Sequence, residues 1–223
     1  MITNTTAMGH SRTSDPADQG HARVSAVVAL TLLEVIQTHD RPAEVFEEED
    51  TSITMPRRLG LSEVVERQIR NYQDGVRRGR KITDAEFTNL VRLVIKRPDS
   101  EEIFLECGRR LAGGKGHRRS RLMPRGFAVA LARRRVRGRL RALFGRRIGG
   151  FAGGGFTMEG RALLFMQSDP GGDACALVSG LCSAVLDATL HGAPAVDHLA
   201  CEARGDAFCR WGIAGGVEQV AHR

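Results

Sequence analysis

The hydrophobic and polar positions in the first half of the chain repeat with the spacing of helices. A polar tail, residues 1–21, precedes a segment at 22–39 whose apolar side chains fill most of a helical face. Such a pattern predicts a buried helix. An acidic linker follows, with the run EEED at 47–50. A second helix is expected to begin at Ser62, as its N-cap, and to end near Arg78.

Two capping signals define the next pair of helices. Thr83 is followed three residues later by Glu86, a capping box that predicts the start of a third helix. Pro98 ends this helix, because proline cannot continue the hydrogen-bond pattern. Asp99 and Glu102 repeat the same signal for a fourth helix, which ends at the next pair of glycines.

The segment after these helices is rich in arginine and glycine. Residues 113–126 have the composition of a loop. A basic amphipathic helix is expected over 127–144, weakened by Gly138. Its apolar side consists of residues at helical spacing, namely Val129, Ala132, Val136, Leu140 and Leu143.

The last third of the chain has short segments typical of strands. Residues 149–168 predict two short strands around the pair Glu159-Gly160. A helix is expected over 174–190 and a hairpin over about 195–214. Helices first and strands last predict an α+β fold, with N-terminal helices and a small antiparallel sheet packed on helices.

The 223 residues suffice for one sizeable domain, or for one domain with a helical extension. The patterns divide the chain into a polar tail (1–21), a helical region (22–112), a basic Gly/Arg-rich loop (113–126), an α+β unit (127–214) and a second tail (215–223). The alternative is that residues 22–214 form a single domain.

The N-terminus lacks the basic start and apolar run of a secretory signal. Polar residues or glycine interrupt the apolar stretches before the ~20 residues that a membrane-spanning helix needs. We therefore expect a cytoplasmic protein. In a reducing compartment, clustered cysteines are more often metal ligands or buried thiols than disulfides.

The net charge of +7 comes from one segment. Residues 109–147 contain 15 of the 33 lysines and arginines and no acidic residue. The other 18 basic residues face 26 acidic ones, so the rest of the chain has a net charge of −8. This distribution differs from that of a uniformly basic nucleic-acid-binding protein.

Three interpretations fit the arginines of the expected basic helix. They can form a solvated helix face, contact an anionic surface such as lipid headgroups or an acidic protein, or pair with the acidic run at 47–50. Nucleic acid is disfavoured, because no aromatic residues alternate with the arginines. The residues concerned are Arg133, Arg134, Arg135, Arg137, Arg139 and Arg141.

The cysteines are the main candidates for chemistry. Cys201 and Cys209 flank a tight Gly-Asp turn, and His198 and Cys175 would complete a tetrahedral set. Thiolate and imidazole are the ligands that Zn²⁺ prefers, and four protein ligands leave no open position, as in structural zinc sites. The alternative is a set of packed thiols, since free cysteine is among the most buried residue types. Of the remaining two, Cys182 is expected to approach the site, line a pocket or pack in the core, and Cys107 to be structural.

The spacing C-x22-H-x2-C-x7-C, with HGAP before the hairpin and GDAFCRWGI at its end, resembles the vinyl-4-reductase domain family. The similarity covers about residues 125–214. This family includes the sensor domains of aromatic-responsive activators and is similar in fold to transport-protein-particle subunits. In the aromatic sensors the metal ligands are Cys, Glu, Cys and Cys. The resemblance therefore implies a structural zinc held by Cys175, Cys201 and Cys209, with His198 at the Glu position; the alternative is an empty site.

The resemblance also implies a homodimer and a hydrophobic cavity between sheet and helices that holds an apolar or aromatic small molecule. The same residues would face the core of any α+β protein, so each is also a candidate for simple packing. The pocket candidates are Phe151, Phe156, Leu164, Phe165, Met166, Cys182 and Trp211.

The sequence offers little support for an enzyme. It contains neither the G-x-G-x-x-G nor the Walker pattern, and no paired carboxylates or nucleophile–base set stands out. We expect a non-enzymatic sensor or carrier. The alternatives are an accessory protein or reductase in tetrapyrrole (bacteriochlorophyll) 4-vinyl reduction, and a regulatory protein that binds a partner or DNA through helices at 62–112.

Overall fold

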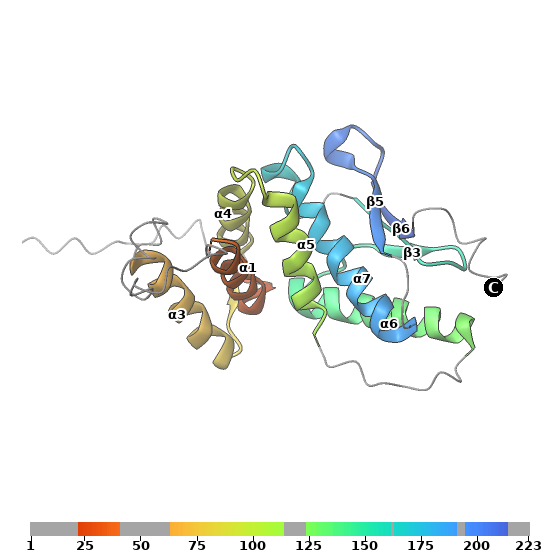
Figure 1. Cartoon of the computed structure of the whole chain (residues 1–223), viewed down its shortest axis with the longest axis horizontal. Coiled ribbons are helices and arrows are strands. Elements are labelled where there is room, and N and C mark those ends of the chain that lie inside the picture. Colours follow the sequence, from red (N-terminus) through yellow and green to blue (C-terminus); the bar gives the residue numbers. More distant parts are fainter. Residues whose placement is uncertain (1–21, 41–62, 114–123, 162, 191–194, 214–223) are drawn as a thin grey trace, which may run out of the picture.

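A computed structural model describes residues 22–40, 63–113, 124–161, 163–190 and 195–213 (Figure 1). These residues form an α+β fold, as the sequence predicts. Its six α-helices are α1 (Ala26–His39), α3 (Glu63–Arg77), α4 (Asp84–Val94), α5 (Ser100–Leu111), α6 (Arg125–Phe144) and α7 (Ala176–Leu190). The expected tails, the acidic run at 47–50, the Ser62 cap and most of the basic loop lie outside the described residues.

Two antiparallel sheets complete the described fold. The strands are β1 (Val24–Ser25), β2 (Lys81–Ile82), β3 (Gly150–Ala152), β4 (Thr157–Gly160), β5 (Val196–Ala200) and β6 (Cys209–Ile213). Three short 3₁₀ helices are η2 (Met166–Ser168), η3 (Asp173–Cys175) and η4 (Glu202–Arg204). In Figure 1, α1, α3 and α4 lie at one end of the molecule, α5 and α7 cross its middle, and the four-stranded sheet lies beyond them.

One hydrophobic core joins all these layers. It runs from Leu32 of α1 through Phe104 of α5 and Leu181 of α7 to Trp211 of β6. Burial of these side chains supplies most of the stabilisation, at roughly 25 cal/mol per Å² of apolar surface removed from water. The helical region and the strand-rich unit therefore share a core.

The starts of α4 and α5 show how well local signals predict caps. The Thr83 hydroxyl accepts a hydrogen bond from the Glu86 backbone N–H at 3.1 Å. This confirms the half of the predicted capping box that Thr83 forms. The expectation for α5 is wrong in its chemistry, because Asp99 makes no side-chain cap. Arg97 donates to both Asp99 carboxylate oxygens instead, at 2.9 and 3.0 Å. The bidentate contact with the Arg97 guanidinium occupies both Asp99 oxygens, which explains the difference.

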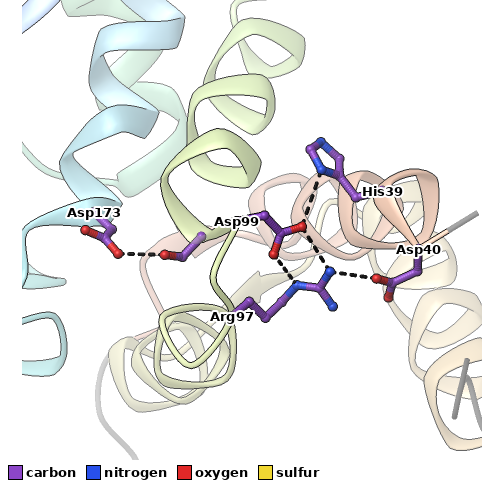
Figure 2. Close-up of polar contacts among 6 residues, drawn as sticks. His39, Asp40, Arg97, Asp99 and Asp173 are labelled. Atoms are coloured by element: carbon purple, nitrogen blue, oxygen red, sulfur yellow. Dashed lines mark hydrogen bonds and ion pairs between the residues drawn. The ribbon is translucent and has the colours of Figure 1, made fainter.

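The Arg97–Asp99 contact is part of a polar network where α1 ends and α5 begins (Figure 2). The Arg97 guanidinium also donates to Asp40 at 2.6 Å, and His39 lies 3.6 Å from the Asp99 carboxylate. Close by, the Ser100 hydroxyl donates to the Asp173 carboxylate at 2.6 Å. The network ties the N-terminal helices to η3, the segment that ends at Cys175.

α5 and α7 approach closely at two glycines. A Cβ at Gly108 would lie 2.0 Å from the Leu177 carbonyl oxygen, and one at Gly180 would lie 2.0 Å from the Leu105 carbonyl oxygen. Any larger side chain would therefore force the two backbones apart. This contact positions α7, and with it the segment that carries Cys175.

The larger sheet has the order β3-β4-β6-β5, with all pairs antiparallel. The predicted hairpin at 195–214 is confirmed as β5 and β6. The two strands predicted around Glu159-Gly160 are wrong in position along the chain. Both residues lie inside β4, and a glycine-rich turn joins β3 to β4. Gly153 adopts a positive φ of 59°, which glycine tolerates without strain, so the turn forms there. Residues 166–168, expected in the second strand, form η2.

One helical segment, Asp173–Leu190, is long and apolar enough to cross a membrane by length and composition, contrary to the expectation from the sequence. This segment comprises η3 and α7, and 61% of it is buried inside the protein. It packs against α5, α6 and the sheet, so its apolar character is accounted for by the core.

Candidate metal centre

The site begins with the loop that presents Cys175. Asp169, which is 1% exposed, accepts hydrogen bonds from the backbone N–H groups of Gly172 (3.0 Å) and Ala174 (2.7 Å). Gly172 has a positive φ of 80°, and a Cβ there would lie 2.5 Å from the Cys201 sulfur. The loop therefore requires glycine at 172 for both its conformation and its contact with the centre.

The other three candidate ligands come from the β5–β6 hairpin. His198 lies on β5, next to an irregularity in strand register between His198 and Ala200. Cys201 follows β5, and its N–H donates to the Asp206 carboxylate at 2.7 Å. Cys209 begins β6. The turn thus brings both cysteines to the same end of the hairpin, as the sequence predicts.

The structure brings the four predicted ligands together. The ligand atoms of Cys175, His198, Cys201 and Cys209 all lie within 4.8 Å of one another. The sulfur atoms of Cys175 and Cys209 are 3.8 Å apart. The three cysteines are buried and the histidine is half-buried. These four residues form a group that can hold a metal ion.

The His198 imidazole supports this arrangement in a second way. Its Nε2 atom is buried and has no hydrogen-bond partner among the described residues. An unpartnered buried nitrogen costs free energy unless a ligand satisfies it. The ring stacks on Trp211, with centroids 5.3 Å apart and an interplanar angle of 17°. Trp211 is fully buried and donates from Nε1 to the Cys175 carbonyl oxygen at 3.1 Å, so it contacts both sides of the centre.

The electrostatics of the centre favour a thiolate at Cys209. Its hydrogen bond with Cys175, together with contacts from His198 and the Glu202 backbone N–H, lowers the pKa of Cys209 to about 5, against the opposing effect of burial. The Glu202 N–H lies 3.4 Å from the Cys209 sulfur. The same hydrogen bond, with burial, raises the pKa of Cys175. Thiolates are the form in which cysteine binds metals.

The remaining two cysteines lie outside this group. Burial raises the pKa of Cys182 to about 12, and that of Cys107 still further. Both side chains are fully buried in the core. Neither belongs to the group of candidate ligands.

The predicted pocket residues are distributed through the core. Phe156, Phe165, Cys182 and Trp211 are buried, and Phe151, Leu164 and Met166 are half-buried against the same core. An open depression of about 400 Å³ lies instead where the β3–β4 edge meets the start of β6. It is lined by Arg147, Ile148, Gly149, Gly150, Glu159, Gly160, Arg161 and Phe208, none of which is among the predicted residues.

The six arginines of α6 divide into two groups. Arg133 donates to the Gly153 carbonyl oxygen at 2.9 Å and Arg139 to the Leu111 carbonyl oxygen at 2.7 Å. Arg135 lies 3.4 Å from the Thr189 hydroxyl. The other three, Arg134, Arg137 and Arg141, are exposed.

Sequence reasoning missed the supporting residues of the centre. Asp169, Gly172 and the stacking of Trp211 on His198 depend on contacts between distant segments. The run DPGGD at 169–173 is the one local signal, because aspartate and glycine in this order are typical of tight turns.

No family model, curated protein or solved structure matches this chain.

Proposed function

We propose that this chain is a non-enzymatic small-molecule-binding protein, a sensor or carrier, whose C-terminal α+β unit is held together by a structural zinc ion. The observation that carries the proposal is the convergence of Cys175, His198, Cys201 and Cys209 from two separate elements. The motif resemblance to the vinyl-4-reductase domain family supports the ligand-binding part. We place the protein in the reducing cytoplasm, where thiolates remain available to a metal.

The distance between the Cys175 and Cys209 sulfur atoms fits a tetrahedral zinc ion. Two sulfur atoms bound at about 2.3 Å to one tetrahedral zinc ion lie about 3.8 Å apart. The Cys175 and Cys209 sulfur atoms are separated by 3.8 Å. The donor set of three thiolates and one imidazole is a standard structural zinc set. The Glu202 N–H and Trp211 would support the ligands from outside, in the way that outer-shell groups orient metal ligands.

A zinc ion here would be structural because four protein ligands complete its coordination. It would join the end of η3, through Cys175, to both strands of the hairpin. Without the metal, the hairpin is held by its pairing with β4, by the packing of Trp211 and by contacts of β5 with α7. Binding energy at such a site becomes folding energy, because the unfolded chain has no preformed site.

The depression at the sheet edge is our candidate for the ligand site. Phe208, which lines it, directly precedes the candidate metal ligand Cys209, and Gly160, which also lines it, pairs with Cys209 across the sheet. Zinc would fix β6 and hence the position of the Phe208 ring. The depression has a volume of about 400 Å³ and is open to solvent.

Ligand binding can be tested with phenol as an aromatic probe. A ligand that binds only the folded protein raises the melting temperature as its concentration increases. We expect phenol to raise the melting temperature of the zinc-loaded protein. The Phe208→Ala variant should need at least five times as much phenol for the same increase. Leu199→Ala, at a half-exposed position of β5 outside the depression, serves as the control and should respond as the native protein does. The proposed site would be contradicted if phenol did not stabilise the native protein. It would also be contradicted if both variants lost the stabilisation by phenol equally.

A further inference from the structure

A row of exposed side chains runs along the solvent face of α6. Its members are Phe127, Ala130, Arg134, Arg137 and Arg141, at successive intervals of three, four, three and four residues. This spacing keeps all five on one side of a helix. We call these residues the α6 row. At 1.5 Å per residue it is about 21 Å long. Figure 1 shows α6 along the edge of the molecule, below α5 and α7.

The row is distinct from the arginines that the fold uses. Arg133, Arg135 and Arg139 project toward the rest of the protein and contact Gly153, Thr189 and Leu111, respectively. Arg133 also lies over the Phe151 ring, 5.2 Å from its centroid. In contrast, none of the ion pairs formed by the described residues includes an arginine of the row.

The arginines of the row repel one another. Like charges three or four residues apart destabilise a helix. Arg134, Arg137 and Arg141 form two such pairs, and α6 contains no acidic residue to offset them. An external anionic surface would remove this repulsion. The row therefore has the character of a binding face.

We propose that the α6 row binds the surface of an anionic phospholipid membrane, with the three guanidinium groups on the lipid phosphates. Phe127 favours lipid over the other anionic partners. Its side chain is 71% exposed at one end of the row, where it can enter the boundary between headgroups and acyl chains. Arginine residues near an anionic membrane surface strengthen binding to that surface. A DNA duplex would use the arginines but gain little from Phe127, because its bases already stack on one another.

The test is cosedimentation of the full-length protein with vesicles. We expect binding to vesicles of 70% phosphatidylcholine and 30% phosphatidylglycerol, and little binding to pure phosphatidylcholine. The triple variant R134Q/R137Q/R141Q should bind the anionic vesicles at least tenfold more weakly. Phe127→Ser should weaken binding several-fold while leaving the net charge unchanged.

The matched control is R67Q/R78Q/R92Q, which removes the same charge from three exposed arginines outside α6. It should retain most of the binding. If both triple variants lost vesicle binding equally, net charge alone would explain the binding, and the proposal would be overturned. Equal binding to neutral vesicles would overturn it as well. So would row-dependent binding to a 30-base-pair DNA without binding to vesicles. Circular dichroism of each variant establishes that it is folded.

Discussion

At the residue scale, the centre depends on side chains that satisfy one another. His198 has a buried nitrogen that lacks a partner in the described protein, and Cys209 is a thiol whose surroundings favour the thiolate. Trp211 holds the His198 ring from one face and bonds to the Cys175 backbone. A metal ion would satisfy the nitrogen and the thiolates together, which makes the four residues one unit.

Trp211 is the single tryptophan of the chain and should report on this unit. It is fully buried and stacked on His198. Removal of the metal with a chelator should loosen the hairpin and expose the indole, so we expect a red shift of its emission maximum. Zinc added back should reverse the change. An unchanged emission spectrum after measured loss of the metal would contradict the placement of Trp211 beside the centre.

Sequence reasoning works best at this scale when the signal is local. The sequence predicts Cys201 and Cys209 as partners because they flank a turn, and the family resemblance implies that Cys175 and His198 complete the set. The Thr83 cap was predictable because the capping box spans three residues. The prediction that Asp99 caps α5 is wrong, because Arg97 binds both of its carboxylate oxygens. The role of Asp169 depends on the folded loop.

The Asp99 contact makes stability depend on pH. The hydrogen bond from Arg97 holds the pKa of Asp99 below its ordinary value. A carboxyl group with a depressed pKa stabilises the folded protein at neutral pH, and this contribution is lost as pH falls below about 4. Asp99→Asn should therefore lower the free energy of unfolding at pH 7 by about 1 kcal/mol, given that both side chains are partly exposed.

This prediction is checked by urea unfolding at several pH values. The difference between Asp99→Asn and the native protein should narrow as pH falls toward 3. Glu101→Gln provides the control, because Glu101 is exposed in the first turn of the same helix and forms no ion pair among the described residues. If the difference in free energy of unfolding between Asp99→Asn and the native protein stayed constant with pH, the Asp99 charge would not be its cause.

At the element scale, the crossing of α5 and α7 is the most demanding contact. Gly108 and Gly180 each face a backbone carbonyl of the other helix, with no room for a methyl group. From the sequence, these glycines are recognisable only as weak helix formers, because helix propensity carries no information about a neighbouring helix. The same limit explains the misplaced strands: the turn at Gly153 and the pairing of β4 with β6 are decided by contacts across the sheet.

Two glycine-to-alanine substitutions separate packing from propensity. Gly108→Ala should destabilise the protein by about 3 kcal/mol or more, because a methyl group would collide with the α7 backbone. Gly138→Ala on α6 meets no atom within 4 Å and should stabilise it by about 0.5–1 kcal/mol through helix propensity. Denaturant unfolding measures both. Similar effects from the two substitutions would contradict the close crossing.

At the scale of the whole molecule, the N-terminal helices and the metal-bearing unit are coupled. They share a hydrophobic core, and Ser100 at the start of α5 donates to Asp173, two residues before Cys175. Sequence patterns predicted the α+β class and the order of elements. They did not establish whether the two parts form one domain or two. The core residues of α1, α5 and α7 are apolar in both cases. Loss of the metal should therefore destabilise the N-terminal helices as well as the hairpin.

The most direct test of this account is the metal content of the purified protein, measured beside Cys201→Ser and Cys182→Ala. We expect about one zinc per chain in the native protein and in Cys182→Ala, whose thiol lies outside the centre. Cys201→Ser should lose the metal and most of its cooperative unfolding. A native protein without metal, together with a Cys201→Ser variant that folds and unfolds as the native chain does, would contradict the structural metal centre.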